Sequence, residues 1–224
     1  MEPAETVVDA IRSALRETAD PALAPGQQAY MKSEMPFLGV RVPAVRVLVR
    51  RLARGPAEPA EVRDTALVLW REAEFREERY AALALMALEP VRGRIDMIPV
   101  HEEMIRTGAW WDLVDEVAHR LAETLDAHPV GMSALLHAWT TDEDLWIRRA
   151  SIIAQLSRGA SVDRELLTAA IEANIDDAEF FIRKAIGWAL RDHARTDPAW
   201  VRSFVAAHPA LSPLSRREAL KHLG

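Results

Sequence analysis

Apolar residues recur at spacings of three and four along almost the whole chain, which is the period of an amphipathic helix. Ala and Leu are abundant, and no segment sustains the apolar-polar alternation of a half-buried strand. Clusters of Gly, Pro and small polar residues interrupt the pattern at residues 21–27, 55–59, 89–94, 106–108, 128–129, 158–161, 196–198 and 208–213. The pattern therefore predicts an all-α protein of about a dozen short helices.

Two of the predicted helices align with each other. Residues 144–156 superimpose on residues 179–190 at an offset of 35, so that Trp146 matches Phe181. The same step back from Trp146 reaches Trp111. A recurring two-helix unit of this length is typical of HEAT-like repeats, which stack into a curved α-solenoid with a concave surface.

The repeat also predicts the domain organisation. We expect a single HEAT-like repeat domain over residues 1–224. Its N-terminal helices, residues 1–55, would form a cap, and the repeats would occupy residues from about 56 to 224.

The alignment provides an internal control for Asp115, because the equivalent positions hold Ala150 and Ala185. On a helical wheel, Asp115 lies at the margin of an apolar stripe with Trp111 one turn before it, whereas Asp112 faces water. The helix dipole explains a first-turn acid such as Asp112. A partly buried carboxylate costs free energy unless it has a partner or a function. We therefore interpret Asp115 as a candidate catalytic residue, with a structural acid as the alternative.

Arg149 raises a similar question, because it lies in the middle of the apolar arc of its helix while Arg148 falls outside it. In the aligned helix, Trp188 and Arg191 follow Lys184 by one and two turns. Cations that rise from apolar helix faces beside tryptophans suit a phosphate backbone and its sugars. The alternative for Arg149 is a buried ion pair with an acid on an adjacent repeat.

The charge of the chain is unevenly distributed. The net charge of −6 argues against a general nucleic-acid coat protein. However, residues 41–54 contain five arginines and no acid, while acids concentrate in residues 55–79. This distribution predicts either a surface that binds a polyanion or a solvated helix face.

Composition excludes several other classes of site. The chain has no cysteine, which removes disulfides, thiolate nucleophiles and cysteine metal sites. The seven histidines are scattered without metal-ligand spacing, so we expect no metal and no cofactor. The first residues do not resemble a secretory signal, and the longest apolar run, residues 80–88, is too short to span a bilayer. We expect a cytoplasmic protein that does not bind membranes.

Five segments carry distinctive motifs. They are AYMKSEMPFLGVRVPAVR (29–46), WWDLVD (110–115), LWIRRA (145–150), FFIRKAIGWALRDHA (180–194) and SPLSRREALKHLG (212–224). Together they resemble the bacterial AlkD family of DNA alkylation repair glycosylases, from about residue 30 to the end of the chain. The resemblance implies a HEAT-like solenoid whose concave, positively charged groove holds duplex DNA. It also implies excision of N3- and N7-alkylated purines without a metal or cofactor.

The resemblance further implies roles for individual residues. Asp115 corresponds to the catalytic aspartate of the family, and Trp111 and Trp188 correspond to its active-site tryptophans. Arg149 and Tyr30 correspond to DNA-binding positions. The helix pattern adds Arg148, Lys184 and Arg191 as further candidates for DNA binding.

The predicted function is that of a DNA-3-methyladenine/7-alkylguanine-type DNA glycosylase acting in base excision repair. Asp115 would stabilise the oxocarbenium-like sugar and orient water, the two tryptophans would hold the deoxyribose, and Arg149 would bind a flanking phosphate. We expect a monomer whose partner is double-stranded DNA containing alkylated purines, associated with the nucleoid when bound. The alternative is a non-catalytic HEAT-repeat scaffold that binds a protein partner or senses DNA damage.

Overall fold

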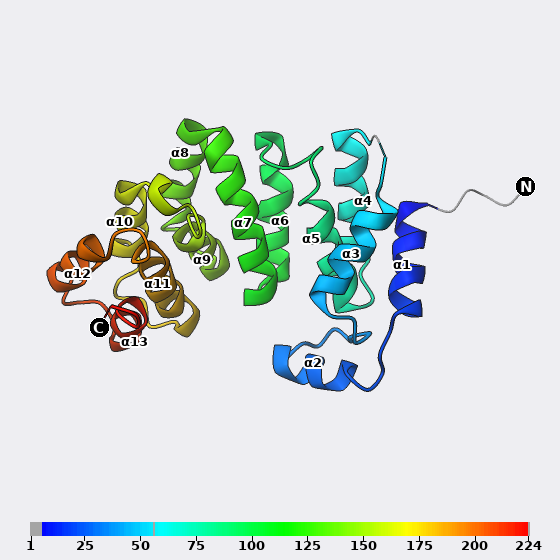
Figure 1. Cartoon of the computed structure of the whole chain (residues 1–224), viewed down its shortest axis with the longest axis horizontal. Coiled ribbons are helices and arrows are strands. Elements are labelled where there is room, and N and C mark those ends of the chain that lie inside the picture. Colours follow the sequence, from blue (N-terminus) through cyan, green and yellow to red (C-terminus); the bar gives the residue numbers. More distant parts are fainter. Residues whose placement is uncertain (1–5, 56, 224) are drawn as a thin grey trace, which may run out of the picture. The chain divides into compact units, whose positions relative to one another are not determined.

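The protein is built from helices in the computed structural model, which describes residues 6–55 and 57–223 (Figure 1). No strand occurs in these two ranges, so the prediction of an all-α fold is confirmed. The chain divides into two compact units, Met1–Arg92 and Gly93–Gly224. The expected single repeat domain, with its N-terminal cap over residues 1–55, stays a prediction.

The first unit contains the following helices, of which α1, α3 and α4 pack against α5. They are α1 (Val7–Glu17), α2 (Ala24–Met31), α3 (Val42–Leu52), α4 (Pro59–Arg71) and α5 (Arg76–Leu85). Helices α1, α3 and α4 all contact α5, which is buried along nearly its whole length. Within α3, Val45, Leu48 and Val49 face this core, while the arginines of the helix point to solvent.

The first turn of α5 buries two acids that we did not single out from the sequence. The Glu77 carboxylate accepts hydrogen bonds from the backbone N–H groups of Leu38, Gly39 and Val40 at 2.9–3.1 Å. Glu78 pairs with Arg12 of α1, with 3.0 Å between Oε2 and Nε. Because a buried carboxylate needs such donors, Glu77 fixes the loop that leads into α3 and Glu78 fixes α1.

The second unit contains the remaining helices. They are the short 3-10 helices η1 (Ile95–Met97) and η2 (Gly159–Ser161), and α6 (Ile98–Gly108), α7 (Trp111–Ala127), α8 (Pro129–Trp139), α9 (Leu145–Ile153), α10 (Arg164–Glu172), α11 (Phe180–His193), α12 (Pro198–Ala207) and α13 (Pro213–Ala219). Helix α9 contacts α7 and α11, and α11 also packs against α13.

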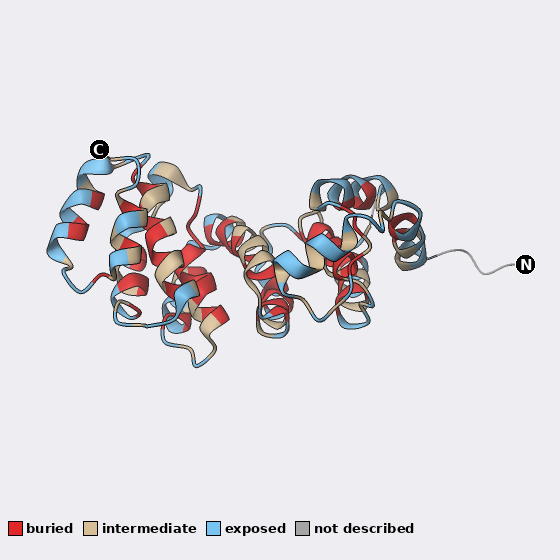
Figure 2. Ribbon diagram, turned by 90° about the horizontal axis from the view of Figure 1, so that it is seen from below, coloured by how far each residue is buried: buried red, intermediate tan, exposed pale blue. Residues whose placement is uncertain are grey.

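Buried residues lie on the helix sides that face neighbouring helices (Figure 2). The apolar stripe predicted for α7 is confirmed, since Leu113, Val114, Val117 and Leu121 are fully buried. Within the described ranges, no helix has both the length and the apolar character needed to cross a bilayer.

The three backbone N–H groups that donate to Glu77 lead to a stability prediction. Glu77→Gln removes the charge and one acceptor oxygen, so we expect the free energy of unfolding of the chain to fall by about 2 kcal/mol or more. Urea denaturation followed by circular dichroism measures this loss.

Glu74→Gln is the matched control. Glu74 pairs with Arg16 on the surface, where its side chain is 70% exposed, so its loss should change stability by less than about 0.5 kcal/mol. Equal effects of the two substitutions would contradict the role assigned to Glu77.

Candidate functional site

A sharp turn between α6 and α7 sets the start of the helix that carries Asp115. Ala109 adopts a left-handed backbone conformation with φ of 41°, and its N–H donates to the Ile105 carbonyl at 3.1 Å. Trp110 is extended and occupies the N-cap position of α7, which then begins at Trp111. Asp115 therefore follows Trp111 by one helical turn, on neighbouring positions of the same face.

The Asp115 carboxylate is held by the Arg149 guanidinium from α9. Nε of Arg149 donates to Oδ1 of Asp115 at 2.8 Å, and Nη2 donates to Oδ2 at 2.8 Å. The two parallel bonds form the bidentate geometry that suits a planar guanidinium and a carboxylate. The buried ion pair that we kept as the alternative for Arg149 is thus present.

This pair is largely shielded from water. The Arg149 side chain is 5% exposed, and the Asp115 side chain is 14% exposed. Burial raises the pKa of Asp115 above its ordinary value, although the hydrogen bonds and positive charge of Arg149 act in the opposite direction. Because Asp115 keeps more exposure than Arg149, the acid is the member of the pair that a ligand can reach.

Arg149 also binds the backbone of α11. Its Nη1 donates to the Phe181 carbonyl oxygen at 2.6 Å, and its Cζ lies 6.0 Å from the centre of the Phe181 ring. The rings of Trp110, Trp146 and Phe181 pack together with centroids 5.0–6.0 Å apart. The sequence alignment matched Trp111 with Trp146 and Phe181. In the structure, the Trp110 ring packs against both of these rings.

The two cations predicted on α11 share one acidic partner. Lys184 Nζ lies 3.1 Å from Oε1 of Glu218 on α13, and Arg191 donates to Oε2 of the same carboxylate. Burial acts to raise the pKa of Glu218, but the hydrogen bonds and charges of these two cations outweigh it and hold that pKa below its usual range. Trp188, between the two cations on α11, is half-buried against the core of the unit.

Arg148 has a structural partner as well. Its Nη2 donates to Asp177 at 3.0 Å, and its Nη1 donates to the carbonyl oxygens of Asp142 and Glu143 at 2.7 and 3.1 Å. All four DNA-binding cations predicted in this unit therefore have intramolecular acceptors. Their contact with DNA stays a prediction.

The first unit holds Tyr30 and the basic segment. Tyr30, on α2, is 72% exposed, and its contact with DNA also stays a prediction. The arginines at positions 41, 46, 50, 51 and 54 are exposed. Among the described residues, Arg41, Arg50, Arg51 and Arg54 form no ion pair.

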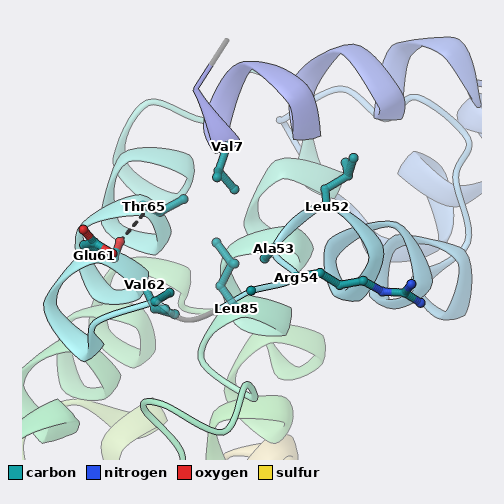
Figure 3. Close-up of a pocket in the computed structure, with 10 residues that line it drawn as sticks. Val7, Leu52, Ala53, Arg54, Glu61, Val62, Thr65 and Leu85 are labelled. Atoms are coloured by element: carbon teal, nitrogen blue, oxygen red, sulfur yellow. Dashed lines mark hydrogen bonds between the residues drawn. The ribbon is translucent and has the colours of Figure 1, made fainter. Parts of the chain in front are cut away.

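A cavity of about 290 Å³ also lies in the first unit (Figure 3). Its wall is mainly apolar, with Val7, Val62 and Leu85 among the lining residues and Arg54 and Glu61 as the charged ones. It contains none of the residues predicted for catalysis, so we do not assign the chemistry to it.

Some contributors to the site escaped the sequence analysis. Glu218 lies in a quoted motif, yet nothing in its local pattern pointed to two cations on another helix. His119 follows Asp115 by one turn, where a positive charge on its ring would act against the effect of burial on the pKa of Asp115. The spacing of four residues was the available signal. In the part of the chain that the structure describes, no group of three or more His, Cys, Asp or Glu residues is placed to bind a metal.

These features define an all-α protein with a buried carboxylate–guanidinium pair beside aromatic residues. The family model of DNA alkylation repair enzymes matches residues 11–223. The chain therefore belongs to the DNA alkylation repair enzyme family. A comparison with curated protein sequences gave no match.

The solved structures that are similar to the chain include the following two. A protein described as a predicted DNA alkylation repair enzyme from Enterococcus faecalis is 28% identical, with a TM-score of 0.79 over 92% of this chain and 97% of that chain. The alkylpurine DNA glycosylase AlkC of Pseudomonas fluorescens, bound to DNA containing an abasic site analog, is 15% identical, with a TM-score of 0.52 over 97% of this chain and 61% of that chain. The likeness to AlkC supports the predicted helical solenoid class, while HEAT-like repeats and a concave groove stay predictions.

The close approach of α13 to α11 generates a prediction for Gly187. A Cβ atom at this position would lie 2.5 Å from Cβ of Glu218 and 3.0 Å from the Ser215 carbonyl oxygen. Alanine gains about 1 kcal/mol of helix propensity, but displacing the α13 backbone costs about 1–3 kcal/mol. We therefore expect Gly187→Ala to lower the thermal midpoint of unfolding.

Gly131→Ala on α8 is the control, because its Cβ would meet only the flexible tip of Ile95 at 3.3 Å. We expect this substitution to leave the midpoint unchanged or to raise it slightly. A stabilised Gly187→Ala protein would show that α13 does not need this close approach.

Proposed function

We propose that the protein is a DNA glycosylase that hydrolyses the N-glycosidic bond of cationic N3- or N7-alkylated purines in duplex DNA. Membership of the DNA alkylation repair family supports this activity class. The observation that carries the finer proposal is the Asp115 carboxylate, which is fixed by two bonds from Arg149 and lies one turn after Trp111.

The chemistry requires little acid catalysis. Alkylation at N3 or N7 leaves the purine cationic, so the base departs readily, and positive charge develops on the sugar instead. A preorganised carboxylate stabilises such an oxocarbenium-like centre and orients the attacking water, as carboxylates do in glycoside hydrolysis. Asp115 takes both roles in this proposal.

The ion pair with Arg149 is compatible with these roles. A carboxylate has about four lone-pair positions, and the two bonds from Arg149 occupy only two of them. The guanidinium charge favours the ionised form against the effect of burial. Asp115 therefore keeps acceptor positions for water or for the electron-poor sugar.

Trp111 and Trp188 complete the proposed catalytic group. Both are half-buried, so each presents part of its surface to solvent. An indole face attracts a cation by about 1–2 kcal/mol where water is excluded. We assign the two rings to the deoxyribose of the damaged nucleotide.

The proposed partner is double-stranded DNA, bound by a monomer in the cytoplasm and associated with the nucleoid when bound. Arg50 and Arg51 on the exposed side of α3 support a polyanionic partner, because neither is paired with an acid of the described residues. The DNA complex of AlkC agrees with this choice. The basic surface of α3 would then supply phosphate contacts in addition to those predicted for Arg148, Lys184 and Arg191.

The catalytic assignment predicts the behaviour of Asp115→Asn. The asparagine side chain keeps the size of the group but loses its charge, so excision should fall by about 10² or more while DNA binding stays near wild type. Incubation with duplex DNA containing N7-methylguanine, followed by alkaline cleavage, counts the abasic sites formed.

Asp112→Asn, a substitution on the same helix three residues earlier, is the control and should retain excision. Circular dichroism checks that Asp115→Asn is folded. If that variant is not folded, Asp115→Glu, which keeps the charge, is used in its place. Normal excision by the Asn variant would refute the assignment. Absence of excision by the wild-type protein would favour the non-catalytic scaffold.

The DNA-binding surface generates a separate prediction. Removal of one phosphate contact lowers the slope of log K against log salt by about 0.9. We expect this change for Arg50→Gln and for Arg51→Gln, measured by fluorescence anisotropy with a labelled duplex between about 50 and 200 mM salt.

Arg94→Gln serves as the charge-matched control, since Arg94 already pairs with Asp96 at 2.8 Å. Its slope should equal that of the wild type. If Arg50→Gln and Arg51→Gln have the same slope as Arg94→Gln, α3 is not part of the DNA-binding surface.

A further inference from the structure

The guanidinium of Arg149 is largely committed within the protein. Three of its five N–H groups already have acceptors, namely both carboxylate oxygens of Asp115 and the carbonyl oxygen of Phe181. The side chain is 5% exposed. A DNA phosphate would have to compete with an existing carboxylate for a group that solvent scarcely reaches.

The same three bonds join three helices. Arg149 is on α9, Asp115 is on α7, and Phe181 is in the first turn of α11. A rigid planar fork with acceptors on two other helices fixes the plane of the carboxylate as well as its position. Trp188 is on the same α11, so the backbone anchor at Phe181 also relates the helix of this tryptophan to the carboxylate.

From this geometry we infer that Arg149 is a positioning residue, which acts on the reaction by orienting the Asp115 carboxylate and not by binding a phosphate of the DNA. The inference rests on the proposed glycosylase function. It replaces the phosphate contact that the sequence led us to expect for Arg149.

The two roles respond differently to lysine. A lysine binds a phosphate as a point charge nearly as well as arginine does, so a phosphate-binding position should tolerate Arg149→Lys. A lysine lacks the planar fork, so it leaves the carboxylate charged and paired but free to rotate. Misplacement of a catalytic group by about 1 Å costs up to about 10² in rate.

We therefore expect Arg149→Lys to lower the single-turnover excision rate at saturating DNA by more than about tenfold. The dissociation constant for the duplex and its salt slope should stay at the wild-type values. Duplex DNA containing N7-methylguanine is the substrate, and anisotropy of the same labelled duplex gives the binding constants.

Arg158→Lys is the matched control. Arg158 pairs with Asp126 through Nε at 3.0 Å and Nη2 at 2.6 Å, and its side chain is 10% exposed, but it lies outside the proposed site. It should keep the wild-type excision rate. This comparison separates loss of the fork at Asp115 from a general cost of replacing a buried arginine.

A second variant, Arg149→Gln, removes the charge. The positioning role predicts an unchanged salt slope, whereas a phosphate contact predicts a slope lower by about 0.9. Loss of the partner of a buried carboxylate is strongly destabilising. Arg149→Gln is therefore used only if circular dichroism shows that it is folded. If it is not folded, Arg149→Lys alone tests the inference.

The outcomes separate this inference from the proposed function. Wild-type excision together with a near-normal rate for Arg149→Lys overturns the positioning role and leaves the glycosylase proposal standing. A weakened duplex affinity or a lower salt slope in either variant also overturns it, in favour of a phosphate contact. A wild-type protein that forms no abasic sites overturns the proposed function itself.

Discussion

The bidentate bond between Asp115 and Arg149 is the interaction on which the site depends. It places two opposite charges in a region from which water is largely excluded, at 2.8 Å for each of its two hydrogen bonds. A buried pair of this kind adds little net stability, but loss of either partner leaves an uncompensated charge. Together with the bond to the Phe181 carbonyl, it ties α7, α9 and α11 to one arrangement of the carboxylate. The main contribution of this pair is therefore to the orientation of the Asp115 carboxylate, and its contribution to the stability of the fold is small.

The charges of the two units are arranged in different ways. In the second unit, the cations nearest the proposed chemistry are paired, and the Glu218 carboxylate accepts from both Lys184 and Arg191. In the first unit, α3 presents Arg50 and Arg51 to solvent without acidic partners among the described residues. A net charge of −6 therefore coexists with a local basic surface. In the proposed function, the basic surface of α3 adds phosphate contacts, and Asp115 of the second unit contributes the chemistry.

The sequence predicted the helical fold and identified Asp115 and Arg149 as unusual, but it did not predict which residues they contact. Helical periodicity identified Asp115 at the margin of a buried stripe and Arg149 within one, and the structure confirms both positions. It left open whether Arg149 meets a phosphate or an acid, because periodicity describes one helix and the partner lies on another. Glu77 and Glu218 escaped notice for the same reason, since their partners are a distant loop and two side chains of a different helix. The left-handed Ala109 was beyond prediction, because this backbone conformation is rare for alanine.

The most direct measurement of the central claim is a double-mutant cycle on the single-turnover excision rate, with Asp115→Asn, Arg149→Lys and the combined variant. If Arg149 acts only through the carboxylate, the combined variant will be no slower than Asp115→Asn alone. If the two losses multiply instead, Arg149 acts independently of Asp115, and the positioning of the carboxylate by this arginine is not what the reaction depends on.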